Sequence, residues 1–187
     1  MKRTHILFPL LLILAMVSDS CIKKEPDDPL ISFRSRKGRV CGHWTSDEGS
    51  IAISNTNYSE SYAIRGNTFT YTGPFGYANG TANVVFDFER DGNCNVSINL
   101  SGFVSEYAGR WDWSGGIGDQ KSKTQIIVHA NTYTDGTGAH TLQGNNYDFT
   151  YDIIELRNKK MVLKLTYRND DSSGGFNAYS ESWTLKQ

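Results

Sequence analysis

Residues 84–101, which read VVFDFERDGNCNVSINLS, contain the clearest structural signal in the chain. In residues 94–101, apolar side chains alternate strictly with Asn and Ser, which is typical of a strand with one buried face and one wet face. Residues 84–88 show the same period of two. Between the two runs lies Asp91-Gly92, a dipeptide that favours a tight hairpin turn. The segment therefore predicts two adjacent antiparallel strands.

The same alternation extends through the rest of the chain. Residues 147–167 predict a second hairpin, with its turn near residue 158. Residues 179–186 predict a final strand that places Tyr179, Trp183 and Leu185 on one face. Weaker alternation predicts strands near residues 39–46, 50–55, 60–65, 67–72, 104–114 and 123–132.

These segments indicate an all-β protein. The chain has 18 glycines, 10 tyrosines and 9 phenylalanines, and aromatic residues favour strands. No segment shows a helical period long enough to connect parallel strands, so a sequential antiparallel meander is favoured. Such a sheet must close or double up to protect its edges, which leaves a barrel and a sandwich as the two candidates.

A short motif near the start of the domain favours the barrel. The segment Arg39-Val40-Cys41-Gly42-His43-Trp44 resembles the Gly-x-Trp signature that opens lipocalins. Residues 147–165 and 182–186 resemble the penultimate hairpin and the last strand of lipocalin-like bacterial lipoproteins. The resemblance implies a single antiparallel up-and-down β-barrel, lipocalin-like, in which Trp44 plugs the closed end. A β-sandwich is the alternative.

The N-terminal residues predict an exported protein. Lys2 and Arg3 precede an apolar run over residues 6–17, which is too short to cross a hydrocarbon core of ~30 Å, since a spanning helix needs ~20 residues. Residues 1–20 are therefore interpreted as a signal peptide. Cys21 follows directly and resembles the lipidation site of a bacterial lipoprotein, which implies a membrane anchor through lipid on this residue. Secretion without an anchor is the alternative.

Residues 21–37 favour a flexible tether between this anchor and the folded domain, residues 38–187. Most of this segment is charged or polar, and it holds two of the chain's four prolines, so it cannot bury enough apolar surface to offset the entropy of ordering. Its acidic residues resemble the export signal that sends some lipoproteins to the outer face of the outer membrane, and a solvated linker is the alternative. We expect an outer-membrane lipoprotein of the cell envelope, with surface exposure left open.

Charge argues against a nucleic-acid partner. Removing residues 1–20 takes Lys2, Arg3 and Asp19 from the 19 basic and 20 acidic side chains, which leaves 17 and 19. Nucleic-acid binding usually needs a basic patch or stripe, and this balance offers none. Residues 38–187 have the size of one domain with one core, and we expect a monomer.

If Cys21 carries lipid, two of the three cysteines remain and could pair with each other. Cys41 and Cys94 would then share an oxidising compartment, in which a disulfide between them is plausible. Two separately buried thiols are the alternative, because a free cysteine packs as a small apolar group.

The sequence contains no recognisable catalytic motif, such as His-Glu-x-x-His, Gly-x-Ser-x-Gly or Cys-x-x-Cys. His43, His129 and His140 are far apart in sequence, and scattered structural histidines explain them better than a metal site. We therefore expect no enzymatic activity, no metal and no cofactor.

A binding protein is the favoured function, because a barrel of about eight strands has room for one small ligand. The family resemblance also implies this class, with a small apolar or amphipathic ligand. The alternatives are a filled barrel that contacts a partner protein or envelope polymer, and a glycan-binding surface lipoprotein. The candidate ligand-binding residues are Trp44, Phe86, Trp111, Trp113, Tyr151 and Trp183.

Overall fold

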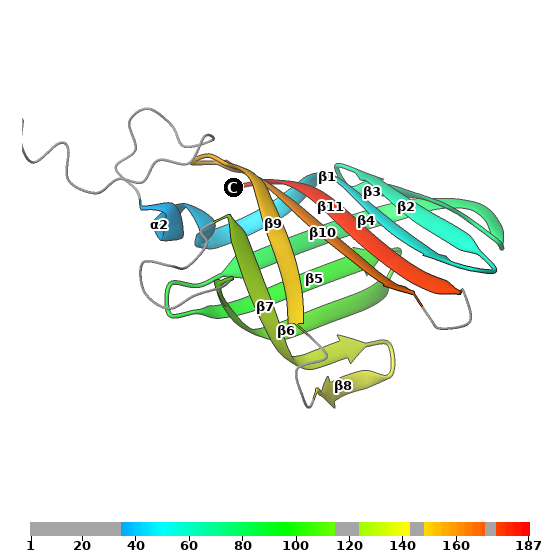
Figure 1. Ribbon diagram of the computed structural model, residues 1–187. Coiled ribbons are helices and arrows are strands. Elements are labelled where there is room, and N and C mark those ends of the chain that lie inside the picture. Colours follow the sequence, from blue (N-terminus) through cyan, green and yellow to red (C-terminus); the bar gives the residue numbers. More distant parts are fainter. Residues whose placement is uncertain (1–34, 115–123, 143–147, 171–174) are drawn as a thin grey trace, which may run out of the picture.

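The computed structural model describes residues 35–114, 124–142, 148–170 and 175–187. The predicted signal peptide, Cys21, most of the predicted tether and Tyr147 lie outside the described residues. In the described residues, one five-residue helix precedes a series of strands (Figure 1). The elements are α2 (Arg36–Val40), β1 (Gly42–Asn55), β2 (Ser59–Arg65), β3 (Thr68–Gly73), β4 (Gly76–Phe88), β5 (Asn93–Leu100), β6 (Phe103–Trp113), β7 (Gln125–Asp135), β8 (Gly138–Thr141), β9 (Asp148–Leu156), β10 (Lys160–Asp170) and β11 (Phe176–Lys186).

The strands form a closed antiparallel barrel, so the predicted barrel is confirmed and the sandwich alternative is wrong. Around the barrel, neighbouring strands pair in the order β6-β5-β4-β3-β2-β1-β11-β10-β9-β7. Pairing of β6 with β7 then closes this ring of ten strands. β8 pairs with β7 and extends the sheet outside this ring. Closing the ring pairs the two outer strands of the meander, β6 and β7, with each other, which is how a sheet of this kind limits edge-to-edge association.

The predicted hairpin of residues 84–101 is confirmed as part of β4 and β5. Phe88 pairs with Cys94 across the hairpin, and the Glu89 N–H donates to the Asn93 carbonyl at 2.9 Å. Gly92 has φ +95°, a conformation that a side chain makes unfavourable. The Asp-Gly signal was therefore informative because this turn needs a glycine.

The barrel has two ends of different width. Residues Gly42–Thr45 of β1 pair directly with Val85–Phe88 of β4, so this end closes through β1-β4-β5-β6-β7-β9-β10-β11, a circuit of eight strands. Farther along β1, the β2–β3 hairpin inserts between β1 and β4 and raises the circuit to ten. We call these the narrow end and the wide end.

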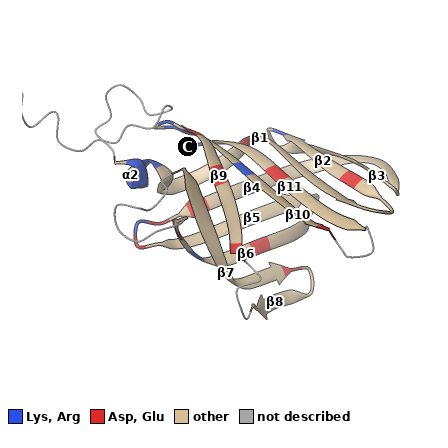
Figure 2. Ribbon diagram, in the orientation of Figure 1, with Lys and Arg blue, Asp and Glu red and all other residues tan. Residues whose placement is uncertain are grey.

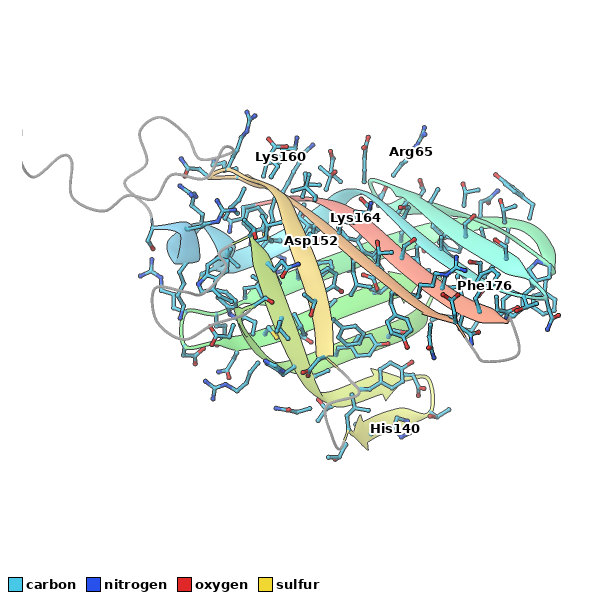
Figure 3. All side chains as sticks on the ribbon, in the orientation of Figure 1. Arg65, His140, Asp152, Lys160, Lys164 and Phe176 are labelled. Carbon is cyan, nitrogen blue, oxygen red and sulfur yellow. The ribbon has the colours of Figure 1, made fainter. Side chains whose placement is uncertain are left out.

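Both ends of the described chain lie at the narrow end. α2 leads into β1 there, and β11 finishes beside it, where the Gln187 side-chain amide donates to the Cys41 carbonyl at 3.2 Å (Figure 1). α2 carries Lys37 and Arg39 in its last turn and is a basic element at this end (Figure 2). Lys160, which begins β10, and Phe176, which begins β11, lie at opposite ends of the barrel (Figure 3).

The structure adds elements that alternation did not predict. α2 was missed because five residues are too few to show a helical period; the Ser35 hydroxyl caps it by accepting from the Gly38 N–H at 3.0 Å. Ser35, Arg36 and Lys37 therefore belong to the folded part, although they were assigned to the tether. Among the described residues, no helix is both long and apolar enough to span a bilayer.

β1 is one strand where two were predicted. A bulge between Ser46 and Glu48 interrupts the alternation of side chains, which is why the pattern appeared to break there. A second register shift lies between Val162 and Leu163 in the pairing of β10 with β9, and it likewise interrupts the alternation of side chains. It leaves Ile154 58% exposed between the buried Ile153 and Leu156.

Aromatic side chains fill the narrow end. Trp44, Phe86 and Trp183 are fully buried, and the Trp44 indole N–H donates to the Val40 carbonyl of α2 at 2.7 Å. Phe86 meets Trp183 edge-on with 5.8 Å between ring centroids. Gly42, the glycine of the Gly-x-Trp motif, has φ +146°, and an added Cβ there would lie 2.1 Å from the Gln187 side chain. In this motif, Gly42 therefore allows the chain to enter β1 beside Gln187, and Trp44 joins the packed aromatic side chains of the narrow end.

Cys41 and Cys94 are free thiols in the structure, so the disulfide offered as one of two outcomes is not formed. Gly42, next to Cys41, pairs with Phe88 of β4, and Phe88 pairs with Cys94 of β5. A whole strand thus separates the two cysteines, and two strand spacings are about 10 Å, whereas a disulfide needs Cα atoms within roughly 7 Å. Burial raises the pKa of both thiols, that of Cys94 to about 12.

Candidate ligand cavity

The wide end encloses a cavity of about 340 Å³. Its lining comes from β1, β2, β5, β6, β7, β9 and β11, and most of it is aliphatic or aromatic. The cavity exists because barrel diameter grows with strand number. Eight strands leave room only for packed side chains, and the ring of ten opens a space that the side chains do not fill.

The floor of the cavity holds a buried carboxylate, Glu181, which is 5% exposed. It lies on β11 between Tyr179 and Trp183 and shares their inward face. Its Oε2 accepts from the Tyr151 hydroxyl at 3.1 Å and from the Trp183 indole N–H at 2.6 Å. Its Oε1 accepts from the Tyr179 hydroxyl. All three donors are aromatic residues, so the carboxylate is surrounded by rings.

These donors hold their protons tightly. Burial, followed by the nearby Glu181 charge, raises the pKa of Tyr151 and Tyr179 well above the usual value. Burial, then Tyr133 and Glu181, raises the pKa of Tyr107 to about 12. At neutral pH the hydroxyls of Tyr151 and Tyr179 therefore stay protonated and act as donors to Glu181.

Glu181 has no cationic partner among the described residues. The ion pairs that the described side chains form involve other carboxylates. Buried charges in proteins are usually paired, because removing an isolated ion from water is expensive. A carboxylate supported only by neutral donors at the floor of an apolar cavity is therefore the most unusual group in this barrel.

Aromatic rings also form the walls of the cavity. Tyr107 of β6 contacts Phe149 of β9 with 5.1 Å between ring centroids, and Tyr133 of β7 at 4.9 Å. On the opposite wall, Tyr62 of β2 packs against Tyr71 of β3 at 5.0 Å. Aromatic contacts of this kind hold rings in fixed orientations, so the wall is preformed.

Exposed aromatic residues lie at the wide end of the barrel, and one of them, Phe103, lines the cavity. Phe103, at the start of β6, lines the cavity and is 83% exposed. Phe75 in the β3–β4 turn is 92% exposed, and Tyr77 follows it at the start of β4. Tyr58 and Tyr167 are also exposed and lie at the wide ends of β2 and β10. Phe103 thus extends the apolar lining of the cavity to its rim.

The candidate ligand-binding residues are distributed unevenly between the two ends. Tyr151 lines the cavity. Trp44, Phe86 and Trp183 belong to the packed narrow end, although Phe86 and Trp183 lie directly against the floor through Tyr151 and Glu181. Their role in binding stays a prediction.

Trp111 and Trp113 lie farther from the cavity than the sequence suggested. Trp111 is buried against Phe88, with 5.6 Å between ring centroids, and Trp113 packs on it at 5.8 Å. The part of β6 that faces the cavity is its other half, from Phe103 to Tyr107. Trp111 and Trp113 therefore do not line the cavity, and the ligand-facing residues of β6 are at the opposite end of the strand.

Sequence reasoning missed Glu181 although its position carried a signal. The period of two that places Tyr179, Trp183 and Leu185 on one face also places residue 181 there. A single acidic residue on an otherwise apolar face is an anomaly that marks either a wet face or a functional group. Tyr62 and Tyr107 were missed because nothing in the sequence shows which tyrosines share one end of a barrel.

The three histidines lie apart on the outer surface. His43 and His140 are exposed and His129 is half-buried. Each is adjacent to an aspartate: His43 Nδ1 lies 2.7 Å from Asp87 Oδ1, His129 Nδ1 lies 2.9 Å from Asp148 Oδ1, and His140 Nε2 lies 3.4 Å from Asp135 Oδ1. Within the described ranges, no group of three His, Cys, Asp or Glu residues gathers in a way that could hold a metal ion.

In comparisons with known proteins, no family model, curated protein or solved structure matches this chain. The functional argument therefore rests on the cavity itself.

Proposed function

We propose that this protein is a non-enzymatic, membrane-anchored lipoprotein of the cell envelope whose barrel binds a small apolar or amphipathic ligand. The observation that carries the proposal is the cavity of about 340 Å³ at the wide end. Its size falls within the range of about 300–1,000 Å³ that is usual for small-molecule sites, which are typically apolar with a few polar groups. The exposed Phe103 at the rim supports an entry path for a ligand with an apolar part.

The position of the chain ends supports the anchor in this proposal. The residues that lead toward Cys21 join the barrel at α2, at the end opposite the mouth (Figure 1). The chain from Cys21 therefore enters the barrel at the packed narrow end. The mouth would remain free to face away from the anchoring membrane.

Ligand uptake is tested with the apolar fluorophore N-phenyl-1-naphthylamine. We use the chain from residue 21 onward with Cys21→Ser, which retains every described residue. The expected result is saturable binding with one site per barrel and enhanced fluorescence. Native mass spectrometry of the same protein would reveal any ligand retained from the cell.

Two matched variants locate the binding site. Ile98 of β5 lines the cavity, whereas the neighbouring Ser97 points to the other face of the same strand. Ile98→Trp should fill the cavity and weaken fluorophore binding by about tenfold or more, since one desolvated side chain can change affinity by that factor. Ser97→Trp should leave it unchanged. No saturable uptake, or equal effects of both variants, would instead favour a barrel that acts through its outer surface.

Anchoring is tested separately, by fractionating cells that express the full chain or Cys21→Ser. We expect the full chain in the membrane fraction and the variant in the soluble fraction. If both fractionate alike, the lipid anchor is wrong, whatever the cavity binds.

A further inference from the structure

The floor of the cavity retains an unused acceptor position. An ionised carboxylate offers about four lone-pair sites on its two oxygens. Oε2 of Glu181 uses two of them, for Tyr151 and Trp183, whereas Oε1 receives only Tyr179. Since Glu181 also lines the cavity, the remaining site on Oε1 is available to a donor that enters from the mouth.

The negative charge of Glu181 also has no counter-charge among the described residues. Tyr151, Tyr179 and Trp183 are neutral donors, and among the described residues no Lys, Arg or His forms an ion pair with Glu181. Neutral donors support a carboxylate but do not cancel its charge. A cation that binds at Oε1 would supply the missing counter-charge in an environment where charge-assisted hydrogen bonds are strong.

The walls favour the same kind of ligand. Tyr62, Tyr107 and Phe149 line the cavity together with Tyr151 and Tyr179. The face of an aromatic ring attracts a cation, by an amount that grows when the cation is desolvated. A carboxylate inside a ring of aromatic side chains is thus suited to an ammonium group, and the aliphatic residues above it are suited to an apolar tail.

The same features oppose an anionic ligand. No Lys or Arg lines the cavity, and a carboxylate or phosphate head group would have to lie beside the Glu181 charge in a medium of low dielectric constant. Like charges at such a site repel each other strongly. A fatty acid would therefore have to keep its head group at the mouth.

We propose that the cavity selects amphipathic amines, with the ammonium group bound to Glu181 at the floor and the apolar part lying between the aromatic walls and the rim. This inference rests on the proposed function, since it assigns the ligand class of the same cavity.

The test compares three compounds with one tail and different head groups: octylamine, 1-octanol and octanoate. Each displaces N-phenyl-1-naphthylamine from the Cys21→Ser chain at neutral pH. We expect octylamine to bind about tenfold to a hundredfold more tightly than 1-octanol, which is the range of a hydrogen bond to a charged group, and octanoate to bind most weakly. Equal affinities of octylamine and 1-octanol, or preference for octanoate, would overturn the inference.

A matched pair of variants tests the role of the carboxylate. Glu181→Gln keeps the shape and removes the charge, so octylamine should lose its advantage while 1-octanol binds as before. Glu106→Gln removes the same charge from the outer face of β6, where Glu106 accepts from the Asn95 side chain at 2.7 Å, and should leave the order of affinities unchanged. If Glu181→Gln binds octylamine as tightly as the unsubstituted barrel does, Glu181 is not the selecting group.

The outcomes separate the two proposals. If neither the fluorophore nor any octyl compound binds, the proposed function fails and this inference fails with it. If the fluorophore and 1-octanol bind but octylamine has no advantage, only the ligand class is wrong. Because the head-group series uses the unsubstituted cavity, it decides the question even if Glu181→Gln does not fold.

Discussion

The narrow and wide ends of this barrel share eight strands, yet the first is packed solid and the second encloses a cavity. The β2–β3 hairpin accounts for the difference, since its insertion between β1 and β4 raises the circuit from eight strands to ten. At the narrow end, inward side chains such as Trp44 and Phe86, which are register partners on β1 and β4, are fully buried. At the wide end, side chains of similar size remain apart and become a wall.

This difference shows that the number of strands in the circuit, rather than the type of side chain, decides which end of the barrel is packed core and which end holds the cavity. Both ends are aromatic: Phe88 and Trp111 pack at the narrow end, and Tyr107 and Phe149 pack at the wide end. The wide end differs chemically only through its hydroxyl groups and the carboxylate of Glu181. Stability should therefore depend on the narrow end and binding on the wide end.

The largest expected effect is at the narrow end. Phe86→Ala should lower the free energy of unfolding by about 3–5 kcal/mol, because it removes a fully buried ring and leaves a void that the barrel cannot collapse around. Denaturant unfolding followed by tryptophan fluorescence measures this change. A loss below about 1 kcal/mol would mean that the narrow end is not the packed plug described here.

A smaller effect is expected where the two ends meet. An added Cβ on Gly49 would lie 2.3 Å from the ring of Trp183, which donates to Glu181. Gly49→Ala should therefore displace that indole, lower the free energy of unfolding by about 1–3 kcal/mol and weaken ligand binding as well.

Gly136→Ala in the β7–β8 turn is the matched control for this variant. Nothing lies within 4 Å of a Cβ added there, so stability should be nearly unchanged. If the two glycine variants behave alike in thermal unfolding, the contact between Gly49 and Trp183 does not organise the floor.

The contrast between the ends also shows what the sequence could predict. Alternation identified the strands and the inward face of β4 and β5, because a strand with one buried face has a strict period of two. The Gly-x-Trp motif favoured a barrel and a plugged end. The cavity could not be predicted in the same way, since it depends on β2 and β3 lying between β1 and β4 along only part of their length. Tyr62 and Tyr107, distant in sequence, face one space for that reason alone.

A further prediction concerns pH. The pKa of Tyr107 is raised to about 12 in the folded protein, from an ordinary value of 10.0, and burial also raises the pKa of Tyr151. The folded state therefore holds these protons more tightly than the unfolded chain does. The stability they contribute is fully present below about pH 10 and is lost as pH rises toward 12 and above.

Alkaline unfolding of Tyr107→Phe provides the measurement. The variant lacks this titrating hydroxyl, so its stability should decline less steeply above about pH 10. Circular dichroism across the alkaline range records the decline. Identical slopes for both proteins would show that Tyr107 does not ionise more readily on unfolding.

Apart from the Gly136→Ala control, the smallest expected effect on stability is at the wide end. Ile98→Ala removes a half-buried side chain that packs against the edge of the core and lines the cavity, so fewer contacts are lost than at a fully buried position and water can enter the enlarged space. The free energy of unfolding should fall by less than about 2 kcal/mol, below the usual range for a packed core isoleucine, while the affinity for N-phenyl-1-naphthylamine changes measurably. If Ile98→Ala costs as much stability as Phe86→Ala, the wide end is packed like the narrow end, and the separation of scaffold from binding site along the barrel axis is wrong.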